Sequence, residues 1–385
     1  MEALKAPFVW FGGKASIADA VWARLGRVDT YVEPFFGSGA VLLGNPHWEG
    51  CVETVNDIDN FVCNAWRAIA AAPDEVARFA DWPVNECDLH ARHVWLVNEG
   101  RERIAACEHD PLHYDAQVAG WWLWGMANWI GGGFCSGEGP WTAEMLAAAR
   151  AAGTYDAKEI VRRRPHLGDA GQGVQRRLPH LRASGQGVNR QRPHLGDAGQ
   201  GVQRKLPHLG AAGKGVKRRL GEYGGAGIFP RNDGLYDYLH QLAWRLRDVR
   251  VCCGDWERIC GPAVTWAGED GSTRATCGMF LDPPYSAEAG RNMNIYSRDC
   301  GAVAHRVRAW CIANGDNRLM HIALCGYEGE HEELAALGWS VLEWKASGGY
   351  SSSAVADDSN GKLNRGRERI WFSPYCRAEP QGRLF

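Results

Sequence analysis

The chain of 385 residues lacks several features that define whole classes of protein. It has no apolar run of about 18 residues or more, so we expect no transmembrane helix and no membrane partner. Its opening residues, MEALKAPFVWFGGK, have no apolar core followed by a small-residue cleavage site, and we expect no secretory signal. The 13 cysteines form no Cys-x-x-Cys pair, which argues against a disulfide framework and against a zinc-finger-type metal site. These absences predict a protein of a reducing cytoplasm without a bound metal.

Two nucleotide-binding fingerprints are also missing. The sequence has no Gly-x-Gly-x-x-Gly, which argues against a dinucleotide-dependent oxidoreductase. Lys14 follows two glycines in Trp-Phe-Gly-Gly-Lys, but the Walker A spacing is absent and a P-loop is excluded. A lysine at such a turn is instead suited to a carboxylate or a phosphate.

Charge is spread unevenly along the chain. The net charge is only −2, but residues 161–219 hold 14 Lys and Arg against 2 Asp, a net +12. The remaining residues hold 29 Lys and Arg against 43 Asp and Glu, a net −14. Such asymmetry indicates a polyanion partner, nucleic acid first, although a solvated basic insertion would have the same composition.

The basic segment is an internal repeat. Pro165, Pro179, Pro193 and Pro207 recur every 14 residues, and each opens a Pro-His-Leu unit. With one Leu and one Val beside its Gly and Pro, a unit of this length cannot build its own core. We interpret the repeat as an extended arm along phosphates or as a duplicated low-complexity linker. The candidate DNA-binding residues are Arg176, Arg177, Arg190, Arg204, Lys205, Lys217 and Arg218.

On either side of this segment, strand and helix patterns alternate, which is typical of a doubly wound α/β fold. The spacing predicts a helix over 16–25, capped by Ser16 with Asp19, and a helix begins after Gly39. A tryptophan-rich stretch, 114–130, predicts a buried helix inside a mostly helical region, 74–150. The other expected strands are 30–33, 52–55, 249–253, 278–281, 321–324, 341–345 and 368–372, and the other helices 61–69, 235–246, 303–312 and 330–337.

The strongest chemical motif is Asp282-Pro283-Pro284-Tyr285, directly after an apolar strand. In open α/β sheets, ligands bind beyond the carboxyl ends of the strands. Two prolines remove two N–H donors, so a carboxylate and carbonyls form a corner of acceptors. Asp282 and the Pro283 carbonyl could each accept one N–H of an exocyclic amine, which aims its lone pair at an electrophile. Tyr285 offers a face on which a base could stack.

A second motif, Glu33-Pro-Phe-Phe-Gly-Ser-Gly39, again runs from strand to turn to helix. Its glycines, Gly37 and Gly39, permit a close approach of ligand to backbone. Asp57 follows the next strand, where an acid can bind ribose hydroxyls or cap a helix. Trp10 could stack on a heterocycle or pack in the core.

Four motifs in this order, WFGGK at 10–14, EPFFGSGAV at 33–41, NDID at 56–59 and DPPY at 282–285, resemble the Dam-like, D12 class adenine-specific DNA methyltransferases in the alpha arrangement. The closing NRGRERIWF is similar to the last strands of that family. The resemblance implies a Rossmann-like sheet that binds S-adenosylmethionine, formed by residues 1–70 and 227–385. It also implies a target-recognition region at 71–226, into which the repeats are inserted.

The resemblance further implies roles for single residues. Trp10 and Lys14 would contact the cofactor, with Lys14 near its methionine carboxylate. The loop around the methionine part would be formed by Glu33, Phe35, Gly37 and Gly39. Asp57 would hold the ribose, and Asp255 with Trp256 would lie near the cofactor adenine. Asp282 to Tyr285 would present N6 of a flipped adenine to the methyl group.

The expected activity is site-specific transfer of a methyl group to adenine N6 in double-stranded DNA, by a monomer in the cytoplasm of a bacterium or of a phage-infected host. Methylation of cytosine N4 uses the same chemistry, and Asp282 tilts the choice to adenine. The motifs are also compatible with an RNA substrate, or with an inactive DNA-binding protein on the same fold. The recognition sequence and a restriction endonuclease partner stay open.

Overall fold

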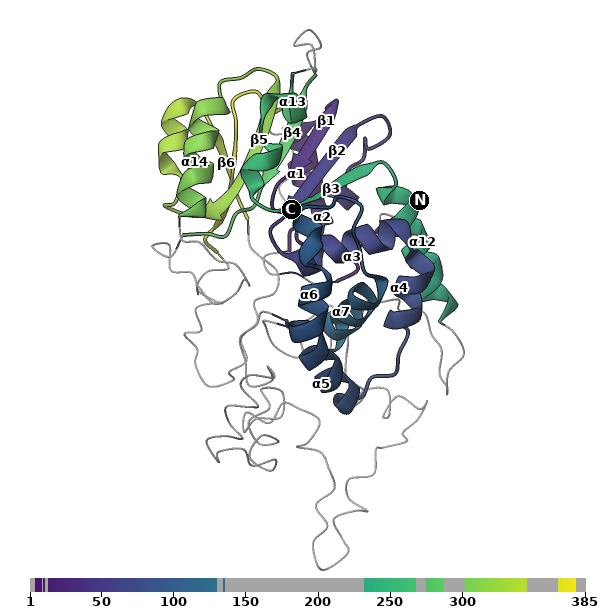
Figure 1. The fold of residues 1–385 in the computed structure, drawn as a ribbon. Helices are drawn as coiled ribbons and strands as arrows, with labels where there is room; N and C mark the ends of the chain where they lie inside the picture. The colour runs from purple at the N-terminus through teal and green to yellow at the C-terminus, as the bar shows by residue number, and fades with distance from the viewer. Residues whose placement is uncertain are drawn as a thin grey trace, which may run out of the picture.

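The structure is a computed structural model, and it describes residues 4–8, 10, 13–129, 134–135, 232–267, 275–286, 302–344 and 366–378. Within them a seven-stranded sheet has the order β3-β2-β1-β4-β5-β7-β6 (Figure 1). Its parallel strands are β1 (Thr30–Glu33), β2 (Val52–Asp57), β3 (Val249–Cys253), β4 (Cys277–Leu281) and β5 (Met320–Tyr327). The antiparallel strands are β6 (Ser340–Glu343) and β7 (Glu368–Phe372).

Side chains alternate between the two faces of the sheet, as the pleat of a strand requires. Tyr31 and Phe280 join the larger apolar core, whereas Val32 and Met279, their chain neighbours, join a second core on the other face. The second face is covered by α14 (Val303–Asn314), by α13 (Pro262–Thr265) and by the 3₁₀ turns η4 (Trp256–Ile259) and η6 (Glu332–Leu337).

The larger core lies under α1 (Ala18–Leu25), α2 (Ala40–Leu43) and α3 (Asn60–Ala71). Against α3 pack α4 (Pro73–Ala80), α7 (Ala116–Asn128) and α12 (Asp233–Leu246), which form the helical layer beside the sheet in Figure 1. Between α4 and α7 lie α5 (Glu86–Trp95), η1 (Leu96–Gly100), α6 (Arg101–Arg103) and η2 (Ala105–Glu108). The domain boundaries at 70 and 227 stay a prediction.

The Rossmann-like α/β fold is confirmed, with two local corrections. The exposed Ser16 does not cap the first helix: it begins at Ala18 after the buried Ile17, and no side chain caps it. Burial of the apolar residue therefore fixes this helix start. The helix expected over 330–337 is a shorter 3₁₀ turn, η6, because the Glu330 side chain binds backbone N–H groups outside it.

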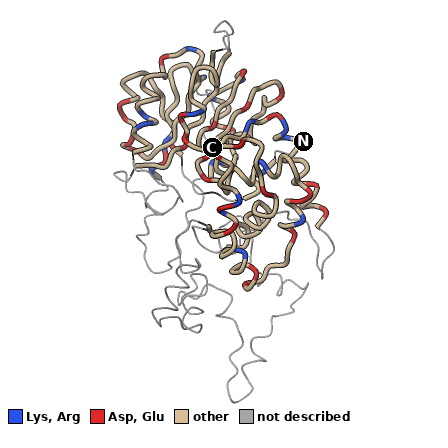
Figure 2. Tube along the Cα trace, in the orientation of Figure 1, with Lys and Arg blue, Asp and Glu red and all other residues tan. Residues whose placement is uncertain are grey.

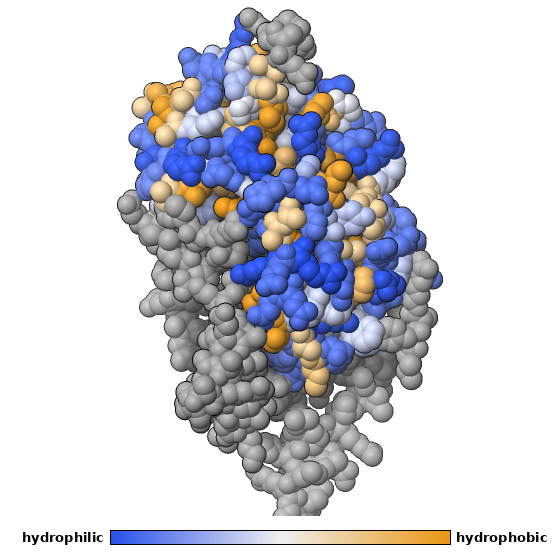
Figure 3. Space-filling model, viewed as in Figure 1, coloured by the Kyte–Doolittle hydropathy of each residue, from blue (hydrophilic) through white to orange (hydrophobic). Residues whose placement is uncertain are grey.

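The tryptophan-rich helix is confirmed as α7, in which Trp122 and Trp124 are buried. Four leucines of α12, at 235, 239, 242 and 246, all point into the core as their spacing predicts. No helix among the described residues has the length and apolar character needed to span a bilayer. The visible surface is largely hydrophilic, with apolar residues in small groups (Figure 3).

Candidate functional site

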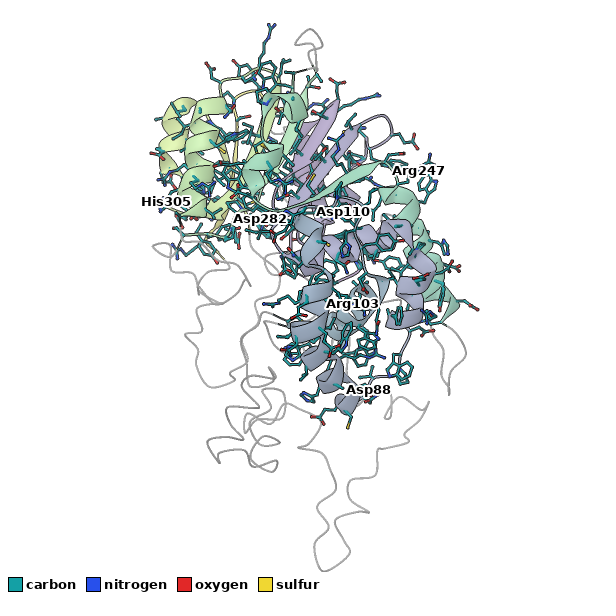
Figure 4. All side chains as sticks on the ribbon, in the orientation of Figure 1. Asp88, Arg103, Asp110, Arg247, Asp282 and His305 are labelled. Atoms are coloured by element: carbon teal, nitrogen blue, oxygen red, sulfur yellow. The ribbon has the colours of Figure 1, made fainter. Side chains whose placement is uncertain are left out.

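Three acidic side chains meet where neighbouring parallel strands end. Glu33 is the last residue of β1, Asp57 is the last residue of β2, and Asp282 directly follows β4. Because β1 pairs with both β2 and β4, these three carboxyl ends are adjacent. Asp282 is labelled at this end of the sheet in Figure 4. The sheet order changes direction here, the usual ligand site of open α/β sheets.

A cavity of about 240 Å³ opens between these strand ends. It brings together nearly all the cofactor-binding residues predicted from the sequence, Trp10, Lys14, Glu33, Phe35, Gly37, Asp57, Asp255, Trp256 and Asp282. Gly39 is not part of the cavity lining. It packs against aromatic side chains, since a Cβ at Gly39 would lie 2.7 Å from the Phe36 ring and 3.1 Å from the Trp66 ring. The motifs at both ends of the chain therefore form one site.

Lys14 and Asp282 form a buried ion pair. The distance from Lys14 Nζ to Asp282 Oδ2 is 2.8 Å, and the lysine side chain is only 4% exposed. Burial alone would lower the pKa of the Lys14 ammonium, but the charge of Asp282 raises it above its ordinary value. Lys14 therefore holds one oxygen of Asp282 and leaves Oδ1 turned to other partners. This contact gives Lys14 the Asp282 carboxylate as its partner, and the expected contact of Lys14 with a cofactor carboxylate stays a prediction.

The glycine turn after β1 is held by Asp57. The N–H of Gly37 donates to Asp57 Oδ2 at 2.8 Å, and the N–H of Asp59 donates to Oδ1 at 2.9 Å. Gly37 has a φ of +48°, and an added Cβ would collide with the Trp10 ring. Glycine is thus required here both by its backbone conformation and by the close approach of Trp10.

Asp57 also has an altered acidity. Burial raises its pKa to about 7, the nearby Asp59 carboxylate adds to the rise, and the backbone N–H groups that it accepts oppose it. The Asp59 side chain accepts the N–H of Phe61 and caps α3. Of the two acids, Asp57 is therefore the one at the strand end and Asp59 the helix cap.

Glu33, at the end of β1, is a buried residue of the cavity lining. Its Oε2 accepts the Tyr31 hydroxyl at 2.8 Å, and burial raises the pKa of Glu33 well above its ordinary value. The neighbouring Asp282 charge acts in the same direction. A cation in the cavity would stabilise the ionised form of Glu33 and so lower its pKa again.

Asn56 is a site residue that sequence reasoning missed. Its Nδ2 donates to the carbonyls of Pro34 at 3.2 Å and of Gly254 at 3.0 Å, so one amide ties together the turns after β1 and β3. Its Oδ1 is buried in the cavity lining and has no hydrogen-bond partner among the described residues. Its place beside two acids in Asn-Asp-Ile-Asp is the signal that could have found it.

Aromatic rings line the far end of the cavity. Phe35 and Trp256 lie 6.0 Å apart with their planes 29° from parallel. Asp255 accepts the N–H of Glu257 at 2.9 Å and caps η4. Arg306 on α14, which the sequence did not single out, pairs with Glu257 at 2.7 Å and Asp255 at 3.5 Å. Arg306 also lines the cavity, so it joins α14 to the aromatic end.

The four residues of the Asp-Pro-Pro-Tyr turn divide into two groups. Asp282 and Pro284 line the cavity, whereas Pro283 and Tyr285 are buried. The Tyr285 hydroxyl lies 2.7 Å from Glu368 Oε2 and 3.3 Å from Asp282 Oδ1, and its ring packs edge-on against Tyr327. The predicted stacking face of Tyr285 is thus turned into the protein in this state.

The seven candidate DNA-binding residues of the repeats, from Arg176 to Arg218, lie outside the described residues, as do most of the 131–137 turn and the 14-residue repeats themselves. In the part of the chain that the structure describes, no cluster of His, Cys, Asp and Glu could hold a metal ion.

Residues 10–82 match the family model described as D12 class N6 adenine-specific DNA methyltransferase. The matched range contains the Trp10–Lys14 segment, the Glu33–Gly39 turn and the Asn56–Asp59 turn, and it ends before Asp282. No curated protein matches the chain. The family resemblance is therefore confirmed over residues 10–82, and with it the class of reaction.

Proposed function

We propose that this chain, a D12 class N6 adenine-specific DNA methyltransferase by its residues 10–82, uses S-adenosylmethionine to methylate an adenine that has left the DNA duplex. The observation that carries the proposal is the Lys14–Asp282 contact of 2.8 Å. It joins the matched N-terminal segment to the Asp-Pro-Pro-Tyr turn within one cavity.

The cavity fits the proposed cofactor by the chemistry of its lining. Phe35 and Trp256 offer flat apolar faces for a purine, and Asp57 offers carboxylate oxygens for ribose hydroxyls. The buried Asn56 Oδ1 is a further acceptor for a ligand N–H or O–H group. S-adenosylmethionine supplies an electrophilic methyl group on a positively charged sulfur.

The charges of the lining favour such a cation. Glu33, Asp57 and Asp282 line the cavity, and Lys14 pairs with Asp282. Burial raises the pKa of Glu33 and of Asp57, and a cation in the cavity would favour their ionised forms. A positive ligand is attracted more strongly at this low-dielectric site than a neutral one of the same shape. The lining would therefore hold the positively charged form of the cofactor more strongly than its neutral form.

Asp282 is the residue that acts on the base. Its Oδ2 is held by Lys14, and Oδ1, 3.3 Å from the Tyr285 hydroxyl, would accept one N–H of the adenine amine while the Pro283 carbonyl would accept the other. Removing the base from the stack costs a few kcal/mol. Fixing both N–H bonds orients the nitrogen lone pair, so the chain contributes mainly by positioning.

The matched family is adenine-specific, which favours adenine N6 over cytosine N4. The intact Lys14–Asp282 pair favours an enzyme over an inactive DNA-binding protein. We further infer that the chain acts on double-stranded DNA, because the matched family acts on DNA and the basic repeats suit a polyanion.

The test is Asp282→Asn, which keeps the side chain's shape but puts an amide in place of the carboxylate. We expect the rate of transfer to fall on the order of 10²–10³-fold, while cofactor binding stays measurable. Mass spectrometry of nucleosides after incubation of DNA with labelled cofactor identifies the product. Asp248→Asn, at a side chain that is 79% exposed, is the control. Wild-type turnover by Asp282→Asn would contradict the proposal. N4-methylcytosine as the product would show that the target base is cytosine and not adenine.

A further inference from the structure

Two buried carboxylates hold the Asp-Pro-Pro-Tyr turn from behind. Glu330 lies in no motif that the sequence singled out, and Glu368 lies in the closing NRGRERIWF without a predicted role of its own. Glu368 on β7 accepts the Tyr285 hydroxyl at 2.7 Å. Glu330, in the loop after β5, accepts the backbone N–H groups of Ser286 at 2.6 Å and Tyr327 at 3.0 Å. Both glutamates are less than a tenth exposed. The turn is therefore fastened at two successive residues.

The Tyr285 hydroxyl has a choice between two acceptors. Its oxygen lies 2.7 Å from Glu368 Oε2 but 3.3 Å from Asp282 Oδ1. A phenol has one proton to donate, so the shorter contact with Glu368 takes it. The Lys14 ammonium, 3.3 Å from the same oxygen, donates to its lone pair. Lys14 thus donates a hydrogen bond to Tyr285, and Tyr285 donates one to Glu368.

The consequence falls on Asp282. Its Oδ2 is bound by Lys14, and Oδ1 is the oxygen that the proposed reaction needs for the adenine amine. Without Glu368, the nearest acceptor for the phenol proton would be Oδ1 itself. A hydroxyl on that oxygen would compete with the amine of the substrate.

The buried glutamate is kept in this role by its surroundings. Burial raises the pKa of Glu368, whereas the Lys14 charge and the Tyr285 hydroxyl lower it. The neighbouring Asp282 and Glu330 carboxylates also raise this pKa. Arg369, next along β7, pairs instead with Glu328 at 3.2 Å and with Glu343 at 3.8 Å. The hydrogen bond from the Tyr285 hydroxyl therefore holds the Glu368 side chain in place.

We propose that Glu368 is a positioning residue for methyl transfer: it draws the Tyr285 hydroxyl away from Asp282 and so leaves Oδ1 open to the amine of the base. This inference rests on the proposed function for the step that it serves. It concerns a residue of the last strand, outside the matched range 10–82.

The test compares Glu368→Met, Tyr285→Phe and the double variant. Methionine keeps the length of the side chain without an acceptor oxygen, so the phenol should turn to Asp282 and single-turnover transfer should fall on the order of 10- to 100-fold. The affinity for S-adenosylhomocysteine should stay within about threefold, because Glu368 lies outside the cavity lining. Removing the competing hydroxyl should restore most of the rate, so the double variant should be faster than Glu368→Met.

Rescue by the second substitution is the decisive outcome, since a purely structural loss would not be reversed by Tyr285→Phe. A double variant as slow as Glu368→Met would overturn the proposal. If Glu368→Met does not fold, Glu368→Gln takes its place in the comparison with the double variant. Because glutamine retains an acceptor oxygen, the loss of rate and its rescue should then be smaller. Glu343→Met, on the neighbouring strand and 78% exposed, is the control. N6-methyladenine made by the wild-type chain tests the proposed function separately, because the inference about Glu368 depends only on the ratios between variants.

Discussion

At the residue scale, Asp57 joins the fold to the proposed chemistry. It fixes the glycine turn through the N–H of Gly37, and it faces the cavity where ribose hydroxyls would bind. Hydroxyl donors favour an ionised carboxylate, whereas burial raises the pKa of Asp57 to about 7. Ligand binding and deprotonation of this one residue should therefore be linked.

Cofactor affinity should consequently weaken as the pH falls through 7. Below the raised pKa, Asp57 is protonated before the ligand arrives, and binding must remove that proton at a cost of up to about tenfold per pH unit. Calorimetry with S-adenosylhomocysteine at several pH values between about 6 and 8 measures this. Asp57→Asn should bind weakly with little pH dependence, and Asp19→Asn, an exposed change on α1, should behave as wild type. A wild-type affinity that does not change with pH would remove Asp57 from the site.

Much of the site could be predicted residue by residue, because the motifs of Glu33, Asp57 and Asp282 each lie at the end of a strand. Lys14, Asp57 and Asp282 each carried a signal of their own. Their contacts could not be predicted: nothing in the sequence indicates that Lys14 pairs with Asp282, or that Tyr285 turns inward to Glu368. Those contacts depend on which strands become neighbours and on the conformation of each side chain.

At the scale of elements, strand positions could be predicted from apolar runs, but their order could not. The alternation of strands and helices indicated a parallel sheet, whereas the place of β4 between β1 and β5 rests on long-range pairing. Local rules were wrong where tertiary contacts competed. Ser16 is a good capping residue, yet the burial of Ile17 sets the start of α1.

One buried ion pair connects α12 to the sheet. Arg245 on α12 bonds both oxygens of Glu53 on β2, at 2.5 and 2.7 Å, and the Leu42 carbonyl at 2.9 Å. Both side chains are less than 5% exposed. Since residues 136–231 separate α12 in sequence from α7, this pair anchors the chain where the catalytic part resumes.

Arg245→Met should therefore lower the free energy of unfolding by about 3–5 kcal/mol, because it leaves the Glu53 carboxylate buried without its cation. Urea denaturation followed by circular dichroism measures the loss. Replacing Glu53 by Met as well should recover part of it, since no buried charge then remains. Arg247→Met, at a 64% exposed arginine just beyond the end of α12, should change stability by less than about 0.5 kcal/mol. Equal effects of Arg245→Met and Arg247→Met would contradict this account.

At the scale of the whole molecule, the described residues and the repeats differ in charge. Lys and Arg are interspersed with Asp and Glu along the described trace (Figure 2). The chain outside 161–219 carries a net −14, and the segment 161–219 carries +12. A catalytic part that is acidic overall repels DNA at long range, so attraction to the phosphates must come chiefly from the basic segment.

Deletion of 165–219 should then make DNA affinity less dependent on salt. Each phosphate contact contributes about 0.9 to the slope of log affinity against log salt, so the loss of several contacts makes the slope shallower by several units. Fluorescence anisotropy with a labelled duplex, between about 50 and 200 mM salt, measures it. A full-length control separates charge from length by replacing Arg176, Arg177, Arg190, Arg204, Lys205, Lys217 and Arg218 with Gln. The two variants should have similar slopes. If both kept the wild-type slope, the repeats would not touch the phosphates, and another part of the chain would have to bind the DNA.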